Sequence, residues 1–422
     1  MKTEFDVIII GGGPAGSAAA ILLARGGWSV ALVEKQNFPR RKVCGECIAA
    51  SNLPLLQALG IGPQFAQVAG PALRQVALLH GAHKVLADLP AAPLENHPWG
   101  RALGRETLDT LLMAQAAQAG AHILQAWAAL RIKGAAGSWR CEVRAMDKGT
   151  LLTLRAAVLV DAHGSWQALP DARAGRNRGH HAADLLAFKA NFREARLAEG
   201  VLPVLAFRGG YGGMVRADGD LTTVACCIRR DELEARRRAT PGLSAGDVVE
   251  ALLKEQCDGV RAALQGAVRD GAWLAAGPLD TGIHLAPDDA MFRIGNAAGE
   301  AHPIIGEGLS MALQSAWLLC AQLLARGPGQ GLDDPAWQRA LARRHAAQWR
   351  AHFATRLRLA AVLAHVAMRP RLIQAVLALL QRWPALLTRA ATWGGKTRSA
   401  ADPSAIAIPN TFSDHAMRQQ GG

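Results

Sequence analysis

Three glycines near the N-terminus have the spacing of a phosphate-binding turn. Gly11, Gly13 and Gly16 form a GxGxxG pattern that directly follows the apolar run at residues 5–10. In such a turn the first glycine permits the tight bend, the second lets a pyrophosphate approach the backbone, and the third lets helix and strand pack closely. The spacing therefore predicts that this segment binds a dinucleotide.

The elements around this turn must position it. Residues 5–10 are typical of a buried parallel strand, residues 17–24 of a helix with small side chains, and residues 28–34 of a second strand. The helix N-terminus offers free N–H groups to phosphates, and Glu34, which ends the second strand, would accept hydrogen bonds from ribose hydroxyls. This βαβ unit does not distinguish NAD from FAD. We include three neighbours in the expected site: Pro14, Ala15 and Lys35.

Later segments alternate between helix and strand patterns. A helix is predicted at residues 105–120 and a buried strand at 151–160. Between 186 and 230 the pattern changes to short alternating runs, and Asp218-Gly219 predicts a hairpin turn between two of them.

The composition indicates a globular protein of two or three domains. Of the 422 residues 50% are hydrophobic and 19% are charged, which allows a large core. The seven cysteines are scattered and odd in number, so we expect no disulfide framework and a reducing compartment. Four residues precede the first strand and no run of about eighteen apolar residues occurs. We therefore expect a cytoplasmic protein with neither a cleavable signal nor a transmembrane helix.

Positive charge is concentrated near the C-terminus. The formal net charge is +13, and residues 335–401 contain eleven Arg, one Lys and no Asp or Glu. The rest of the chain is close to neutral, which argues against nucleic-acid binding. The segment to residue 393 predicts amphipathic helices broken at Pro370 and Pro384. Such helices are typical either of a solvated layer or of peripheral contact with a membrane through 335–398, and both alternatives stay open.

Three separated segments resemble one superfamily of flavoproteins, which contains para-hydroxybenzoate-hydroxylase-like monooxygenases and geranylgeranyl-reductase-like enzymes. The segments are 7–16 with 33–34, then 158–164, then 293–308. The resemblance spans about residues 5–325 and implies that the dinucleotide is FAD. Two positions depart from the family pattern, because His163 and Asn296 stand where the family usually has Asp.

The resemblance also implies which residues contact the flavin. Arg105 would contact the phosphate or ribityl chain, and the Asn296 oxygen can still accept from a ribityl hydroxyl. The helix after Gly308 would direct its N-terminus at the flavin ring and stabilise the reduced form by up to about 1–2 kcal/mol. The further contacts implied are Cys44, Gly295, Pro303, Gly306, Gly308 and Leu309.

The loop at residues 39–47 contains Cys44-Gly45-Glu46-Cys47 and is similar to the Lys-x-Cys-Gly loop of geranylgeranyl-reductase-like proteins, which lies near the flavin ring. A redox or metal-binding CxxC pair would need a thioredoxin-like context or a second pair, so we expect no metal site. Cysteine packing near the flavin, a structural role and redox chemistry all stay open. The candidate proton donors or substrate-orienting residues are Cys44, Glu46, His302 and Glu307.

These patterns predict an α/β fold, α+β overall. A Rossmann-like FAD-binding domain would comprise residues 1–75, 101–185 and 277–330. An inserted antiparallel-sheet substrate domain would comprise 76–100 and 186–276. A basic helical region and tail would follow at 331–422.

The predicted function is that of an FAD-dependent oxidoreductase. No second GxGxxG with strand context occurs, so NAD(P)H would bind transiently as electron donor, or a partner would supply electrons. Its chemistry would reduce or oxidise an apolar or aromatic substrate. The alternatives are hydroxylation through a peroxyflavin, and a membrane-associated flavin electron carrier. A halogenase is disfavoured because no Trp-x-Trp-x-x-Pro segment occurs. The aromatic residues that suggest the substrate class are Trp99, Phe188, Phe192, Phe207, Tyr211 and Trp273.

Overall fold

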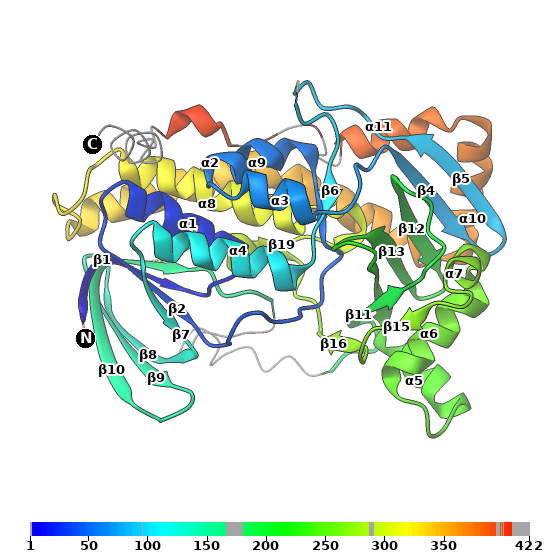
Figure 1. Cartoon of the computed structure of the whole chain (residues 1–422), viewed down its shortest axis with the longest axis horizontal. Coiled ribbons are helices and arrows are strands. Elements are labelled where there is room, and N and C mark those ends of the chain that lie inside the picture. The colour runs from blue at the N-terminus through cyan, green and yellow to red at the C-terminus, as the bar shows by residue number, and fades with distance from the viewer. Residues whose placement is uncertain are drawn as a thin grey trace, which may run out of the picture.

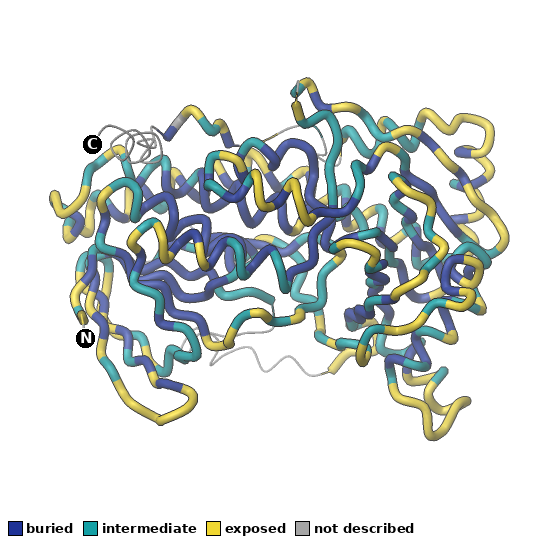
Figure 2. The backbone as a smooth tube through the Cα atoms, viewed as in Figure 1, coloured by how far each residue is buried: buried dark blue, intermediate teal, exposed yellow. Residues whose placement is uncertain are grey.

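The structure is a computed structural model of the chain and describes residues 2–94, 96–165, 180–286, 291–393, 397, 399 and 401–406. Two large β-sheets form its two halves, each covered by helices (Figure 1). Buried backbone runs through the sheets and the helices packed on them (Figure 2). The predicted fold class is confirmed. Lys396 and Arg398 of the predicted basic region, and its tail beyond 406, lie outside the described residues.

The first sheet is built around the strand that precedes the glycine turn. Its strands in spatial order are β7 (His122–Gln125), β2 (Val30–Glu34), β1 (Glu4–Ile10), β10 (Leu151–Asp161), β9 (Ser138–Ala145) and β8 (Trp127–Ala135), with β18 (Phe292–Arg293) beside β10. β1 lies between β2 and β10 and runs parallel to both. The carboxyl ends of these three strands therefore meet at one edge, where open parallel sheets bind ligands.

Both faces of β1 are covered, which explains its unbroken run of apolar residues. Val7 and Ile9 belong to a core that the sheet shares with its helices. Ile8 and Ile10 lie on the opposite face, in a cluster with Trp139 of β9. The helices of the first core include α1 (Pro14–Arg25), α2 (Leu53–Ala58), α3 (Gly62–Val68), α4 (Arg105–Gln118) and α8 (Gly308–Leu324).

The second sheet has eight strands from two separate parts of the chain. In spatial order they are β15 (Val268–Arg269), β11 (Leu185–Arg193), β14 (Thr222–Arg229), β13 (Gly210–Arg216), β12 (Val201–Phe207), β4 (Gln75–His80) and β5 (His83–Asp88), with β16 (Leu274–Ala276) beside β11. The hairpin predicted at Asp218-Gly219 is confirmed, since β13 and β14 pair antiparallel across it. One pair differs from a purely antiparallel sheet. β4 and β12 run parallel, which the long stretch of chain between them permits.

Successive side chains along the strands of the second sheet point to opposite faces, and each face packs in its own hydrophobic cluster. Cys226 belongs to a cluster with α5 (Arg230–Ala239), α6 (Ala245–Gln256) and α7 (Asp258–Ala263). Its neighbour Cys227 belongs to the cluster on the other face, with the C-terminal helices. The alternating strand pattern at 186–230 did not predict the three helices that follow it. The short strands are β3 (Cys47–Ile48) with β6 (Arg101–Ala102), and β17 (Gly282–Ile283) with β19 (Gly299–Glu300).

The C-terminal helices are α9 (Pro335–Ala367), α10 (Pro370–Arg382) and α11 (Ala385–Trp393), so the breaks predicted at Pro370 and Pro384 are confirmed. α9 contacts α8 in the first half of the molecule and β12 and β13 in the second. Among the described residues, no single helix is long and apolar enough to cross a membrane; α9 and α10 are so together, but the pair is bent by 105°. The domain boundaries stay predictions.

Candidate active site

A cavity of about 410 Å³ connects the two halves of the molecule. Its first end lies at the glycine turn after β1, next to the N-termini of α1, α4 and α8. Its second end lies between one face of the eight-stranded sheet and the helices α9, α10 and α11. We call these the cofactor end and the apolar end.

The glycines of the cofactor end have the conformations that the turn requires. Gly11 has φ +107°, and a Cβ there would overlap the carbonyl oxygen of Ala162. A Cβ on Gly16 would overlap the carbonyl oxygen of Gly11, so α1 and β1 approach closely only because this residue is glycine. A Cβ on Gly13 would meet only Arg105 Nη2, at 3.6 Å, and Gly13 lines the cavity. Gly13 is thus the open position where a pyrophosphate could approach the backbone.

Glu34 lies at the cavity with its carboxylate held by the backbone. Its Oε2 accepts from the Gly12 N–H at 2.7 Å and its Oε1 from the Gln36 N–H at 2.9 Å. The residue is 3% exposed and lines the cavity, so its remaining lone pairs could accept from a ribose. Lys35, predicted next to it, is exposed and is not among the lining residues.

Three cations gather at the cofactor end. Arg105 makes two 2.7 Å hydrogen bonds to Asp109; although burial alone would lower the pKa of Arg105, Asp109 raises it. Arg40 and Lys42 line the cavity beside it. Burial, with the neighbouring charges of Arg105 and Arg40, lowers the pKa of Lys42 to about 8. A diphosphate would supply the missing negative charge. The sequence analysis did not assign Arg40 or Lys42 to the site, although the basic loop carried the signal.

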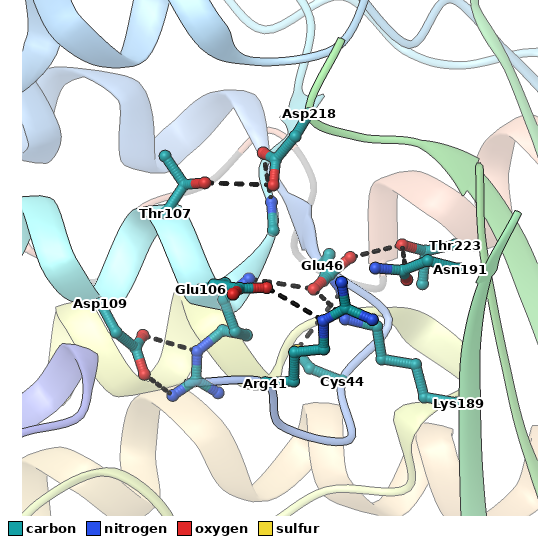
Figure 3. Close-up of polar contacts among 12 residues, drawn as sticks. Arg41, Cys44, Glu46, Glu106, Thr107, Asp109, Lys189, Asn191, Asp218 and Thr223 are labelled. Carbon is teal, nitrogen blue, oxygen red and sulfur yellow. Dashed lines mark hydrogen bonds and ion pairs between the residues drawn. The ribbon is translucent and has the colours of Figure 1, made fainter. Parts of the chain in front are cut away.

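Glu46 connects the 39–47 loop to both halves of the molecule (Figure 3). Its carboxylate pairs with the ammonium of Lys189 from β11 and accepts from the Thr223 hydroxyl of β14 at 2.5 Å. It also accepts from the Arg105 N–H at 2.9 Å, where α4 begins. The side chains of Glu46 and Lys189 are only 1% and 3% exposed. Glu46 lines the cavity, as predicted for a site residue, but three donors occupy its carboxylate, which favours an anchoring role over proton donation.

The two cysteines of this loop both line the cavity. Cys44 is half-buried, and its sulfur accepts from the Glu46 N–H at 3.3 Å. The Cys44 thiol also interacts with the Arg105 side chain, which places it next to the expected phosphate contact. Cys47 is buried, and no cysteine of the described residues forms a disulfide. This arrangement agrees with a cysteine that packs near the cofactor.

The segment after β18 forms the wall opposite the glycine turn. Gly295 has φ +59° and packs on Ala15, where an added Cβ would lie 2.9 Å from the Ala15 Cβ. Asn296 donates to the Ser165 hydroxyl at 2.5 Å, and Ser165 donates to Glu300 at 2.6 Å. The amide nitrogen of Asn296 is thereby engaged within the protein. Its side-chain oxygen is the atom that could accept from a ribityl hydroxyl.

The N-terminus of α8 faces the same end of the cavity. Gly306, with φ +63°, turns the chain into this helix. The predicted contacts Pro303, Gly306, Gly308 and Leu309 all line the cavity. Glu307 is not among the lining residues. It is fully buried, with its carboxylate 3.6 Å from Arg356 Nη1 of α9. It therefore ties this turn to α9, and its predicted role as a proton donor has no support from its position.

Two predicted histidines lie behind the cavity wall. His302 Nδ1 lies 3.0 Å from the Tyr211 hydroxyl, and only Tyr211 of this pair lines the cavity. Burial lowers the pKa of His302 and raises that of Tyr211, so both are neutral at pH 7. His163 pairs with Asp161 at the end of β10 and is absent from the lining residues. It is a satisfied histidine at a strand end.

The apolar end is lined by aliphatic side chains from four separate segments. The lining residues include Val76, Leu78, Leu202, Val204, Ile304, Leu363, Val366, Ile373, Val376, Leu380, Leu386 and Leu387. Of the aromatic residues predicted for a substrate region, Phe188 and Tyr211 line the cavity. Phe192, Phe207 and Trp273 instead pack in the cluster with α5–α7. The sequence analysis did not identify α10 and α11 as cavity walls.

A family model described as an FAD binding domain matches residues 4–352. Conditioned medium factor receptor 1 of Dictyostelium discoideum is 28% identical over 346 residues, which are 76% of this chain but 64% of that protein. The chain thus spans less than two thirds of that relative's length. Digeranylgeranylglycerophospholipid reductase 1 of Methanopyrus kandleri is 24% identical over 376 residues, 83% of this chain and 87% of its own. Menaquinone reductase of Mycobacterium tuberculosis is 33% identical over 120 residues, 28% of each chain.

Solved structures share the fold. A myxobacterial chondrochloren halogenase has a TM-score of 0.69 at 18% identity, over 99% of this chain and 89% of its own. A geranylgeranyl bacteriochlorophyll reductase-like protein of Thermoplasma acidophilum has the same TM-score of 0.69 at 15% identity, over 93% of this chain and 99% of its own. Halogenases and reductases are thus equally similar in fold, and the fold alone does not separate their reactions.

Proposed function

Since this chain belongs to the FAD binding domain family, we propose that it is an FAD-dependent reductase that acts on an extended apolar substrate, with NAD(P)H as transient electron donor. That it is an FAD-dependent oxidoreductase follows from the family and from its flavin-dependent relatives. When bound, FAD would supply the hydride chemistry. The identity of the substrate is the part that the proposal adds.

The residues of the cofactor end fit the dinucleotide. Gly13 is open to a pyrophosphate, and α1 begins there without a side-chain cap. Arg105 Nη2 lies 3.6 Å from the position that a Cβ on Gly13 would take. Glu34 is available to a ribose at the other side of the turn. The cations Arg40, Lys42 and Arg105 line the site, and they interact there with only two carboxylates, Glu34 and Asp109. A bound diphosphate would balance this excess of positive charge.

The apolar end is the observation that carries the proposal. The cavity continues from the FAD site into a chamber whose described walls are mainly aliphatic, with the Tyr211 hydroxyl and the Cys227 thiol as polar groups from its strands. Ligand sites are typically apolar with a few polar groups that fix orientation. The chamber would exclude water and bind a long hydrocarbon chain by burial of apolar surface. Two relatives are named as reductases of digeranylgeranylglycerophospholipid and of menaquinone, which favours the same class of substrate.

Hydroxylation is the second candidate. An apolar chamber beside the flavin also suits a reaction with oxygen that must exclude water. A probable FAD-dependent monooxygenase of Pseudomonas aeruginosa shares the fold with a TM-score of 0.65. A simple electron carrier needs no chamber of this kind, so the cavity favours an enzyme.

The test follows NAD(P)H oxidation by purified protein with a detergent-solubilised polyprenol, with and without oxygen. We expect yellow protein that releases FAD on heating, and anaerobic turnover that converts one double bond per NAD(P)H consumed. Substrate-dependent oxygen uptake with hydroxylated product, and no anaerobic turnover, would replace the proposal by the monooxygenase. Protein that FAD neither colours nor stabilises would overturn both.

A further inference from the structure

We propose that the outer faces of α10 and α11 are a docking surface for an anionic lipid bilayer, placed directly over the apolar end of the cavity. This docking surface consists of Arg371, Leu372, Leu379, Arg382, Trp383, Arg389 and Trp393. That a substrate enters the cavity from the bilayer through this surface rests on the proposed function. The docking itself does not.

Large apolar side chains are exposed along these helices. Leu372 and Leu379 are 42% and 44% exposed, and Trp383 and Trp393 are 52% and 73% exposed. Figure 2 colours much of the outer edge of α10 and α11 as exposed. Leu372 and Leu379 are seven residues apart, which places both on one side of α10, and Trp383 directly follows the last residue of that helix. The exposed apolar side chains therefore form a continuous stripe and are not scattered singly over the surface.

The residues of α10 that line the chamber belong to the same apolar side as this stripe. Ile373 and Leu380 are buried and line the chamber, and Val376 lines it between them. Ile373 follows Leu372 and Leu380 follows Leu379, so the two sets lie side by side along the helix. One edge of this apolar side therefore lines the chamber, and the other edge, with Leu372 and Leu379, is exposed.

The charges that flank the stripe specify the partner. Arg371, Arg382 and Arg389 are exposed, and the sequence from 335 to 401 contains no Asp or Glu. The Arg382 guanidinium lies 5.7 Å from the centre of the Trp383 ring. Arginine beside tryptophan and leucine is the composition of helices that lie in a bilayer interface and bind anionic headgroups. A protein partner with an acidic apolar groove would be the other occupant of such a surface, and the experiment includes it as an outcome.

The geometry favours docking over insertion. α9 and α10 are bent by 105° at the break between them. Thr388 of α11 donates to the Asp88 carbonyl of β5 at 2.7 Å, which holds α11 on the sheet edge. The helix pair therefore stays part of the folded protein while its outer side faces the bilayer.

The experiment is vesicle sedimentation of the FAD-loaded full chain. Phosphatidylcholine vesicles are compared with vesicles of phosphatidylcholine and phosphatidylglycerol, at low and high salt. We expect at least tenfold more binding to the anionic vesicles, reduced by salt because the charge contribution is screened. The variant Leu379→Glu/Trp383→Glu should lose vesicle binding at least tenfold, and Arg371→Gln/Arg382→Gln should lose mainly the preference for anionic vesicles.

The matched control is Leu151→Glu, which changes a leucine of β10 that is 67% exposed in the other half of the molecule. It should bind vesicles like the wild type. Equal binding by all variants, or no binding by the wild type, would overturn the docking surface. Lipid-free dimers that Leu379→Glu/Trp383→Glu converts to monomers, with no vesicle binding, would identify a protein interface instead and also overturn it.

Turnover separates this proposal from the proposed function. With a detergent-solubilised polyprenol the Leu379→Glu/Trp383→Glu variant should be as active as the wild type, since neither residue lines the cavity. With the polyprenol embedded in anionic vesicles it should be at least tenfold slower. If the protein binds vesicles but shows no turnover, the docking surface is supported and the proposed function is wrong. If it shows turnover but does not bind vesicles, the proposed function is supported and the docking surface is wrong.

Discussion

The two ends of the cavity are built in different ways. At the cofactor end the decisive feature is backbone conformation: glycines at Gly11 and Gly16 allow contacts that no side chain would permit. At the apolar end the walls are interchangeable aliphatic side chains from the eight-stranded sheet and from α9–α11. Backbone-determined sites tolerate little change, whereas apolar walls accept substitutions that keep volume and hydrophobicity. The same fold can therefore keep one cofactor while the substrate changes.

The sharpest test of the cofactor end is Gly13→Val. Gly13 has φ −71° and ψ −176°, which any residue adopts, so the substitution should leave the fold intact. Its side chain would occupy the place of the pyrophosphate, and FAD binding should weaken at least about 100-fold, ~3 kcal/mol. The ratio of flavin to protein absorbance measures retention, and circular dichroism measures the fold. Gly16→Val is the contrasting variant and should disrupt folding itself, because a Cβ at Gly16 would lie 1.9 Å from the Gly11 carbonyl oxygen. Flavin retained at wild-type level in Gly13→Val would show that the pyrophosphate lies elsewhere.

The connection between the two ends is tested by Glu46→Ala. Lys189 would then be a buried, unpaired charge, and the free energy of unfolding should fall by about 3–5 kcal/mol. The double variant Glu46→Ala/Lys189→Met removes both charges and should recover most of the loss. Urea unfolding of the three proteins measures the effect. Equal destabilisation of the single and double variants would show that the pair does not hold the loop.

The apolar end is tested by Val204→Phe. Val204 lies on β12 opposite Gly213 of β13, and both line the cavity. A phenyl ring should fill part of the chamber and cost substrate binding about 1–3 kcal/mol, a KM about 10–100-fold higher, with FAD retained. If Val204→Phe lost its flavin and kept an unchanged KM, the FAD and not the substrate would occupy the apolar end.

The smallest expected effect is the pH dependence caused by Lys42. Without FAD its pKa is about 8, and a bound diphosphate would raise it, so binding FAD favours the protonated form. FAD affinity should therefore fall as the pH rises above 8, by up to about tenfold per pH unit, until the pKa of the complex is reached. The unfolding free energy of the apo protein should change in the opposite sense. Because the folded pKa lies below the unfolded value of 10.5, stability should rise between pH 8 and 10.5. Lys42→Met should flatten both profiles, and an unchanged FAD profile would remove Lys42 from the phosphate site.

The difference between the two ends also explains what could be predicted. The Gly11–Glu34 unit could be identified because its function depends on geometry within one βαβ unit. The partner of Glu46 could not, because Lys189 is 143 residues away and no local pattern connects them. Pro370 and Pro384 predicted where the C-terminal helices break, but not that α10 and α11 close the chamber. The contact of Glu307 with Arg356 of α9 could not be predicted for the same reason, since it exists only in the tertiary structure.

The walls that α10 and α11 contribute lie beyond residue 352, where the match to the family model ends. The chamber therefore combines walls inside the matched residues, on β4 and β12, with walls outside them. Recombination or engineering that exchanges the segment from about residue 363 onward would alter the substrate chamber without touching any glycine of the FAD site.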